Sequence, residues 1–242
     1  IRDNAKEINF KLNPTISNAY LRVQDVMILQ LINDMPIDRP IYFAVTVSHN
    51  SMLGLDKYLE MQGLVYKFTG KENLDPSSSP RLNVEKTVQF ISETNDYNNH
   101  IKNSDDYIKA INGNKGIYRY RNLNNEEVYF SKDIIRMTQN FRSPFLQSAQ
   151  ELIYQDKLDR ANHILLSMDK SIPINTIPIL HSDYQLTVAR LFAMAGNKDK
   201  FNFYMQDLMN RKDLTIQDHY DISSVLLMDS HTINEGEEYI KK

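Results

Sequence analysis

The 242-residue sequence contains no cysteine and no tryptophan, and only seven of its residues are glycine. Without cysteine the chain can form no disulfide, no thiolate nucleophile and no thiolate zinc site. The lack of cysteine is compatible with an oxidising compartment, where an unpaired thiol is a liability. Sparse glycine is typical of a mainly helical chain, because tight turns are the positions that most need glycine.

The chain also lacks an excess of one charge and a long apolar run. Its 28 basic and 31 acidic residues are interspersed and leave a net charge of −3, so no basic stripe predicts nucleic-acid binding. The longest apolar-rich run, residues 41–47, is far shorter than the ~20 residues of a membrane helix. No signal peptide is predicted. Because Ile1 is not a natural start, we expect a fragment of a longer protein.

The first third predicts a compact α/β unit. A helix is expected over residues 19–33, followed by a strand at Arg39–Val47 whose continuous apolar residues indicate burial on both faces. A helical pattern at Leu55–Gln62 and a second strand at Leu64–Phe68 come next. A right-handed crossover would pair the strands in parallel, while the short connection leaves antiparallel pairing open.

The next segment predicts a loop, two helices and a hairpin. Asn73–Pro80 is expected to be a surface loop and Asn83–Glu93 a short helix. Ser104 can cap a helix that Gly113–Gly116 would end. The tyrosine-rich stretch from Ile117 to Phe130 is expected to form a hairpin with arms at 117–121 and 128–130.

From Ser131 onward the pattern is helical. The pattern in Glu151–Leu165 returns in Arg190–Met205 at an offset of about 40 residues, which predicts repeated helical hairpins similar to tetratricopeptide repeats. We therefore predict an α+β chain with a small α/β domain at 1–130 and a helical-repeat domain at 131–242. The helices are expected to begin at Ser131 and to span residues 144–155, 160–168, 183–195, 199–210 and 216–228.

No spacing among the histidines predicts a metal site, and no motif predicts a cofactor. Asp218-His219-Tyr220-Asp221 is the most metal-like cluster, but on a helix His219 points away from the two aspartates, which favours a capped helix start. The six histidines are His49, His100, His163, His181, His219 and His231.

Catalytic motifs are equally lacking. His181-Ser182-Asp183 could suggest a hydrolase, but Ser182 or Asp183 as a helix N-cap is the simpler interpretation. Gly113-Asn114-Lys115-Gly116 lacks the spacing of a phosphate loop, and Ser77-Ser78-Ser79 lacks the setting of a nucleophile elbow. No catalytic residue is predicted.

Four residues remain as candidates for binding. Arg142, within Asn140-Phe141-Arg142, could pair with a buried acid, hold a ligand phosphate or serve the structure alone. Tyr118, Tyr120 and Tyr129 on the expected hairpin could stack on a sugar or pack against each other across the strands.

An ordered set of segments resembles the C-terminal region of a bacterial family of multi-spanning membrane proteins. That family is similar to protein O-mannosyltransferases and is largely of unknown function. The matching segments are Asp25, Arg39–Val47, Gly54–Leu59, Gly63–Tyr66, Tyr120–Asn124 with Val128–Phe130, Asn140–Arg142 and the closing helical hairpins.

The resemblance implies a non-catalytic domain, because the catalytic acid of such enzymes lies in a loop between membrane helices that this chain lacks. It implies an extracytoplasmic, periplasmic position, a membrane-embedded parent that could be the glycosyltransferase, and an acceptor polypeptide or another protein as partner. The alternative is a helical-repeat interaction scaffold unrelated to glycosylation. A hydrolase that uses His181 or His219 is a third hypothesis.

Overall fold

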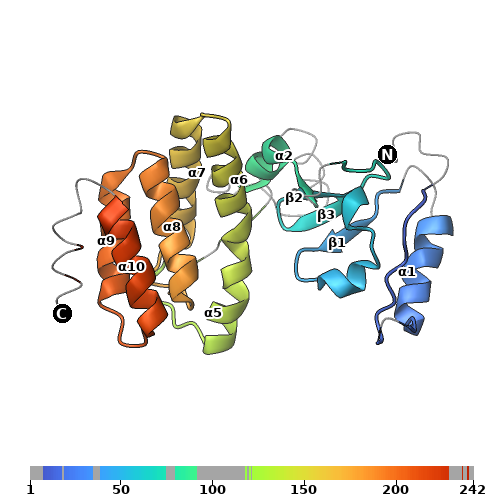
Figure 1. Cartoon of the computed structure of the whole chain (residues 1–242), viewed down its shortest axis with the longest axis horizontal. Helices are drawn as coiled ribbons and strands as arrows, with labels where there is room; N and C mark the ends of the chain where they lie inside the picture. Colours follow the sequence, from blue (N-terminus) through green and yellow to red (C-terminus); the bar gives the residue numbers. More distant parts are fainter. Residues whose placement is uncertain are drawn as a thin grey trace. The chain divides into compact units, whose positions relative to one another are not determined.

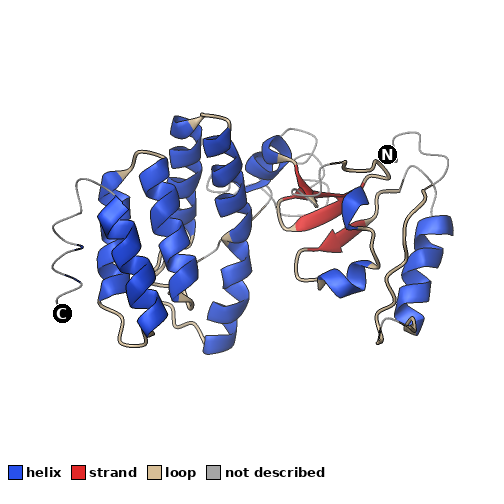
Figure 2. Ribbon diagram, viewed as in Figure 1, coloured by secondary structure: helices blue, strands red, loops and turns tan. Residues whose placement is uncertain are grey.

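The computed structural model describes residues 8–34 except 18, 39–74, 80–91, 118, 120, 122–228, 236 and 239. The chain divides into two compact units, Ile1–Arg119 and Tyr120–Lys242. Strands occur in the first unit, and the described part of the second unit is built from helices (Figures 1 and 2). The predicted α+β class is confirmed. The expected helix after Ser104 and the turn at Gly113–Gly116 lie outside the described residues.

The first unit contains a small mixed sheet in the order β1-β3-β2-β4. β3 pairs antiparallel with both β1 and β2, and β4 pairs parallel with β2. Gly63 and Leu64 connect β2 to β3, so these two strands form a hairpin. The strands are β1 (Tyr42–Ala44), β2 (Leu59–Gln62), β3 (Val65–Phe68) and β4 (Arg81–Leu82).

The strand predicted at Arg39–Val47 is much shorter in the structure and is not buried on both faces. β1 is an edge strand in which only Phe43 is buried, and the side chain of Tyr42 is 49% exposed. It pairs with β3 in the antiparallel direction, without a crossover. A continuous apolar run does not show which of its residues reach the core, because that depends on strands far along the chain.

The helix predicted at Leu55–Gln62 is wrong. A single 3-10 turn, η2 (Asp56–Tyr58), leads directly into β2, whose four residues are all buried. Leu55, Tyr58 and Leu59 do have helical spacing, but pairing with strands on both sides satisfies the backbone of β2 instead. Tertiary pairing therefore overrides the local pattern.

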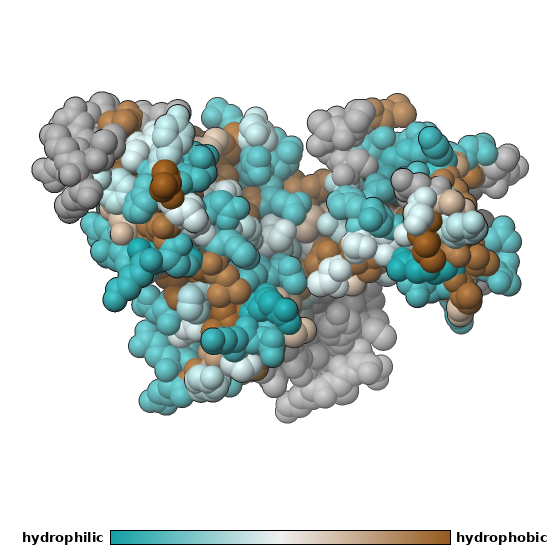
Figure 3. Space-filling model, turned by 60° about the horizontal axis from the view of Figure 1, so that its bottom comes forward, coloured by the Kyte–Doolittle hydropathy of each residue, from teal (hydrophilic) through white to brown (hydrophobic). Residues whose placement is uncertain are grey.

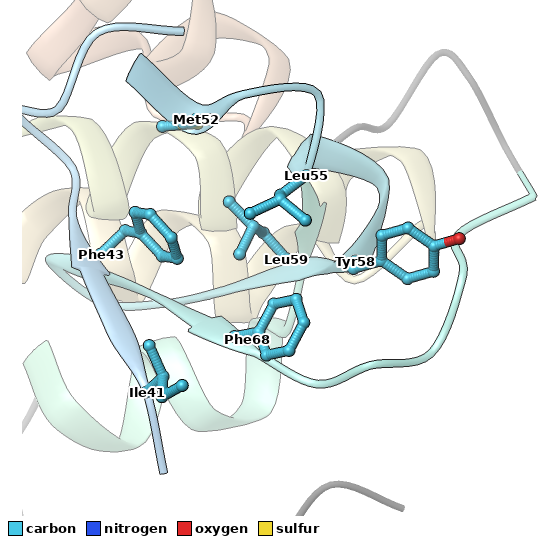
Figure 4. Close-up of a cluster of buried hydrophobic side chains, with 7 residues drawn as sticks. All are labelled: Ile41, Phe43, Met52, Leu55, Tyr58, Leu59 and Phe68. Atoms are coloured by element: carbon cyan, nitrogen blue, oxygen red, sulfur yellow. The ribbon is translucent and has the colours of Figure 1, made fainter. Parts of the chain in front are cut away.

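One apolar cluster holds the sheet unit together (Figure 4). Ile28 and Ile32 of α1 (Val23–Asp34) pack against it, which confirms the helix predicted before the first strand. Other apolar residues of α1, such as Met27, are exposed, and Figure 3 shows hydrophobic side chains among hydrophilic ones at the surface. The cluster consists of Ile41, Phe43, Met52, Leu55, Tyr58, Leu59 and Phe68.

Asp25 anchors the start of α1. Its buried carboxylate accepts hydrogen bonds from the Arg22 backbone N–H (2.8 Å), from the Arg22 guanidinium and from the Thr15 hydroxyl. Arg22 also donates to the Ser51 hydroxyl (3.0 Å). Burial opposes ionisation, but these donors outweigh it and hold the pKa of Asp25 below its ordinary value.

The helices predicted in the second unit are confirmed. The Ser131 hydroxyl accepts from the Ile134 N–H (3.4 Å) at the start of α5, and Pro144 lies in the first turn of α6. Figure 1 shows α6 to α10 packed beside one another. The helices are α5 (Lys132–Thr138), α6 (Ser143–Tyr154), α7 (Leu158–Ser171), α8 (Ser182–Met194), α9 (Lys198–Met209) and α10 (Ile216–Met228). The first unit also contains α2 (Val84–Ile91), at the predicted helix of residues 83–93.

The predicted internal repeat is visible in the backbone. In the α6–α7 and α8–α9 turns, the residues after the helix donate to helix carbonyls in the same pattern, and the middle residue is left-handed. That residue is Asp156 (φ 57°) in the first turn and Gly196 (φ 79°) in the second. The matched bonds are Gln155→Glu151, Asp156→Ile153 and Lys157→Leu152, and Ala195→Leu191, Gly196→Ala193 and Asn197→Phe192.

Candidate functional site

The second arm of the hairpin predicted between Ile117 and Phe130 is not a strand, and of the first arm the structure describes Tyr118 and Tyr120, which are not in a strand either. The described residues of this stretch contain no strand, because their backbone bonds close successive turns: Leu123 N–H to Tyr120 (3.2 Å) and Val128 N–H to Asn125 (3.1 Å). Of the two tyrosines in the second unit, Tyr120 is buried and Tyr129 is exposed, so they do not form one stacking surface. Each has its own environment.

Tyr118 covers the turn between β2 and β3. Its hydroxyl accepts from the Leu64 N–H (2.7 Å), and its ring contacts Phe90 edge to face, with centroids 6.4 Å apart. A Cβ at Gly63 (φ +69°) would lie 2.5 Å from the Tyr118 hydroxyl, so only glycine fits here. This tyrosine has a structural role.

Tyr120 is part of the core of the second unit. It is 7% exposed, and its ring packs against Phe141 (6.1 Å between centroids) and Phe145 (5.8 Å). A ligand cannot reach a ring enclosed in this way, so Tyr120 positions the residues that precede the candidate site.

Tyr129 is 86% exposed and lines an open groove of about 700 Å³ in the second unit. This volume is within the range of pockets that hold small molecules. One wall is the turn-rich segment before α5, and the other is the connector between α7 and α8. The lining residues are Glu126, Glu127, Val128, Tyr129, Phe130, Ile135, Asn175, Thr176 and Pro178.

Side chains fasten the two walls to each other. The Thr176 hydroxyl donates to the Leu123 carbonyl in the opposite wall, and it also lies 3.2 Å from the Pro173 carbonyl. Gln139, directly after α5, belongs to neither wall, but its amide donates to the Pro178 carbonyl (3.1 Å) and so holds the connector in place. A groove whose walls are already fixed loses little conformational entropy when it binds.

Arg142 fixes the first half of the connector. Its fully buried guanidinium donates to the Ile172 carbonyl (3.1 Å), to the Ile177 carbonyl and to the Gln139 side chain (3.0 Å). Burial lowers the pKa of Arg142 from its ordinary value. Of the roles predicted for this residue, these contacts support the structural one, since its hydrogen bonds go to carbonyls rather than to an acid or the open groove.

Arg211, which the sequence pattern did not single out, fixes the second half of the connector. It donates to the carbonyls of Ile179 and Leu180 (2.9 Å each) and to Asp213 (2.7 Å). The bond with Asp213 raises the pKa of Arg211. An arginine two residues before an aspartate was the available signal, and it is too common to identify such a role.

The Asp218 cluster is a helix start, as predicted. The Thr215 N–H donates to Asp218 (2.7 Å), and the Asp218 N–H donates to the Thr215 hydroxyl (3.2 Å), which together form a capping box for α10. Hydrogen bonds to its carboxylate from the Ser182 hydroxyl, the Thr215 hydroxyl and the Thr215 N–H lower the pKa of Asp218 to about 2. In the described part of the chain, no group of His, Asp and Glu residues could hold a metal ion.

The cap predicted for α8 is wrong in detail. The N-cap is His181, without a side-chain bond to the helix, and the Ser182 hydroxyl donates to Asp218 instead. The start of α10 therefore competes successfully for the hydroxyl that would have capped α8. His219 contacts the Tyr239 hydroxyl through Nδ1 (2.6 Å).

A family model described as TMEM260-associated domain 2 matches residues 1–86 of this chain. The matched region contains the whole sheet and ends within α2, so it does not include the groove. No curated protein and no solved structure matches the chain. Among the helices that the structure describes, none is both long and apolar enough to cross a membrane.

Proposed function

We propose that this chain is a non-catalytic domain of a glycosyltransferase-like membrane protein, on the periplasmic side of a bacterial membrane, and that it binds an acceptor polypeptide or a partner. The match to TMEM260-associated domain 2 supports the association, because TMEM260 resembles protein O-mannosyltransferases. The order of the sequence motifs across the rest of the chain supports the same assignment.

The groove beside the connector is the observation that carries the binding role. It combines an exposed aromatic ring at Tyr129, apolar surface at Phe130 and Pro178, and a polar amide at Asn175. Such a mixture is typical of surfaces that hold a peptide, since rings supply contact area and amides can bond to a peptide backbone. The fastened walls mean that this surface exists before the ligand arrives.

The contacts of the histidines support a non-catalytic role. In a nucleophilic triad the serine hydroxyl donates to a histidine, which is oriented by a carboxylate. Here Ser182 donates directly to Asp218, and His219 contacts Tyr239. Among the described residues, no serine hydroxyl is hydrogen-bonded to the imidazole of His181 or His219, so the hydrolase hypothesis has no geometric support.

The non-catalytic claim can be tested directly. The purified chain should show no sugar transfer from a lipid-linked or nucleotide-linked donor and no hydrolysis of that donor. Turnover above that of a heat-denatured sample would contradict the claim.

The binding claim can be tested by photo-crosslinking. A photoreactive phenylalanine analogue at position 129 should capture polypeptides that carry O-linked hexose from an envelope extract. The matched control is the same analogue at position 154, because Tyr154 is 72% exposed in the same unit but does not line the groove. Equal capture at both positions would contradict binding in the groove.

The second candidate function is a protein-interaction scaffold unrelated to glycosylation, which the paired helical hairpins would also suit. The crosslinking experiment separates the two. Capture at position 129 of one defined assembly without O-linked sugar would favour the scaffold.

A further inference from the structure

The charged residues that line the groove are acidic. Among the residues that the structure describes, its lining contains two carboxylates, Glu126 and Glu127, and neither lysine nor arginine. Both side chains belong to exposed residues, and neither forms an ion pair with another residue that the structure describes. The Glu127 N–H donates to the Asn125 side chain (3.0 Å), so a local turn holds the backbone of the acidic pair in place. Within the described part of the chain, no ion pair neutralises the negative charge of these two carboxylates.

The ring beside these carboxylates favours the same kind of ligand. The ring of Tyr129 is 86% exposed, which leaves its face accessible. A cation over the face of an aromatic ring is attracted by the negative charge of the π system, and arginine also stacks on it. The apolar surface of Phe130 and Pro178 can cover the methylene stem of a long basic side chain.

We propose that the groove selects a basic segment of polypeptide, with an arginine or lysine lying over Tyr129 and facing Glu126 and Glu127. The inference rests on the proposed function in one respect, that a polypeptide occupies the groove. A neutral sugar could stack on the ring and donate hydroxyl hydrogen bonds to the two carboxylates, but it would form no ion pair with them, and an acidic segment would be repelled by them. Charge complementarity therefore decides for the basic segment.

The test uses three fluorescent hexapeptides of equal length, measured by fluorescence anisotropy at low ionic strength. One has two arginines flanking a tyrosine, the second replaces the arginines with neutral citrulline, and the third replaces them with glutamate. We expect the arginine peptide to bind about 5- to 20-fold more tightly than the citrulline peptide, from two exposed charge contacts and one cation–π contact. Added salt should reduce this preference.

Charge-matched variants locate the effect. E126Q/E127Q should abolish the preference for arginine over citrulline. E151Q/D156N should retain it, because it removes one carboxylate in the last turn of α6 and one in the turn that follows, and neither residue lines the groove. Y129A should weaken the arginine peptide by about 3- to 10-fold, and Y154A should leave it unchanged. Circular dichroism of each variant verifies that the helices are intact.

Three outcomes would overturn the inference. Equal affinity for the arginine and citrulline peptides, weakened by Y129A, would retain a polypeptide in the groove and remove only the charge selection. A preference that persists in E126Q/E127Q would place the selection elsewhere. Failure of all three peptides to bind, with Y129-dependent binding of a mannose oligosaccharide, would overturn both this inference and the polypeptide-binding role.

Discussion

The two helical hairpins of the second unit share a backbone but differ in what holds them. The α6–α7 and α8–α9 turns have the same hydrogen-bond pattern. In the second hairpin Phe192 stacks on Tyr204, with ring centroids 5.4 Å apart. The corresponding positions of the first hairpin, about 40 residues earlier, are the aliphatic Leu152 and Ile164. The two hairpins therefore have the same turn geometry but different side chains in their interiors.

Polar side chains of the second hairpin bind the first hairpin. The Tyr204 hydroxyl donates to Asp169 of α7 (2.7 Å), the Lys200 ammonium donates to the same carboxylate, and Asn197 donates to Asn162 (2.8 Å). Each hairpin also contributes one arginine to the connector between them, Arg142 before α6 and Arg211 after α9. Stacked hairpins of one chain thus gain their order from polar side chains as well as from apolar contact.

Loss of Arg142 should have the largest effect on stability. It should cost more than loss of Arg211, the other arginine that binds the connector. Arg142→Met keeps the stem but leaves the buried carbonyls of Ile172 and Ile177 without their donor, so we expect a loss of about 2–4 kcal/mol in the free energy of unfolding. Arg211→Met should cost about 1 kcal/mol, because Arg211 is partly exposed. Urea denaturation followed by circular dichroism measures both. Equal costs would contradict the difference drawn between the two arginines.

Removal of the Tyr204 hydroxyl should come next. Tyr204→Phe keeps the stacked ring and deletes the bond to Asp169, which we expect to cost about 1–1.5 kcal/mol. The measurement is the free energy of unfolding from urea denaturation. In an Asp169→Asn background the same substitution should cost less, since the charged acceptor is already gone. Additive costs would show that this bond does not join the hairpins.

Substitutions of the two left-handed turn residues should have smaller effects on stability, and the two effects should have opposite signs. Gly196→Ala meets no atom within 4 Å of its new Cβ, so its expected cost of about 1 kcal/mol is purely conformational. Asp156→Gly should stabilise by at most about 0.5 kcal/mol, because strain relief is offset by a more flexible unfolded chain. Thermal unfolding of both variants is the measurement. An unchanged midpoint for Gly196→Ala would mean that the turns relax.

The smallest effect concerns the link between α8 and α10. The pKa of Asp218 is lowered to about 2 from 3.8, so its contribution to stability is present above about pH 4 and is lost as the pH falls towards 2. Asp218→Asn should therefore lower the unfolding midpoint at about pH 5 but hardly at about pH 2. Asp221→Asn is the control, because Asp221 does not bond to α8 in the described structure. A constant difference across this range would contradict the role given to ionised Asp218.

The sequence predicted the described helices of both units but mispredicted part of the sheet of the first unit, for a physical reason. Ser131, Pro144 and Gly196 are local signals that act on the helix or turn in which they lie. The strands depend on pairing between segments distant in the chain, as between β2 and β4. Local spacing at Leu55–Gln62 therefore predicted a helix where a buried strand forms.

The candidate site was also predicted only in part from the sequence. Tyr129 was a candidate from sequence because of its residue type, but the residues around it, 128–130, are not the strand that was expected to present it. Asn175 and Pro178, in the opposite wall of the groove, are about 50 residues further along, and no periodic pattern connects the two segments. Arg211 was missed because its partners are backbone carbonyls, which have no sequence signature.

The sequence by itself determined the α+β class, the helical hairpins of the second unit and the lack of cysteine chemistry, since these follow from residue type and local periodicity. The tertiary structure alone decided that Arg39–Val47 contributes a short edge strand, that three tyrosines occupy three separate environments, and that a groove opens beside the connector. Those outcomes depend on which groups from distant parts of the chain form each backbone hydrogen bond and each apolar contact. Local sequence does not specify these partners, because they come together only when the whole chain has packed.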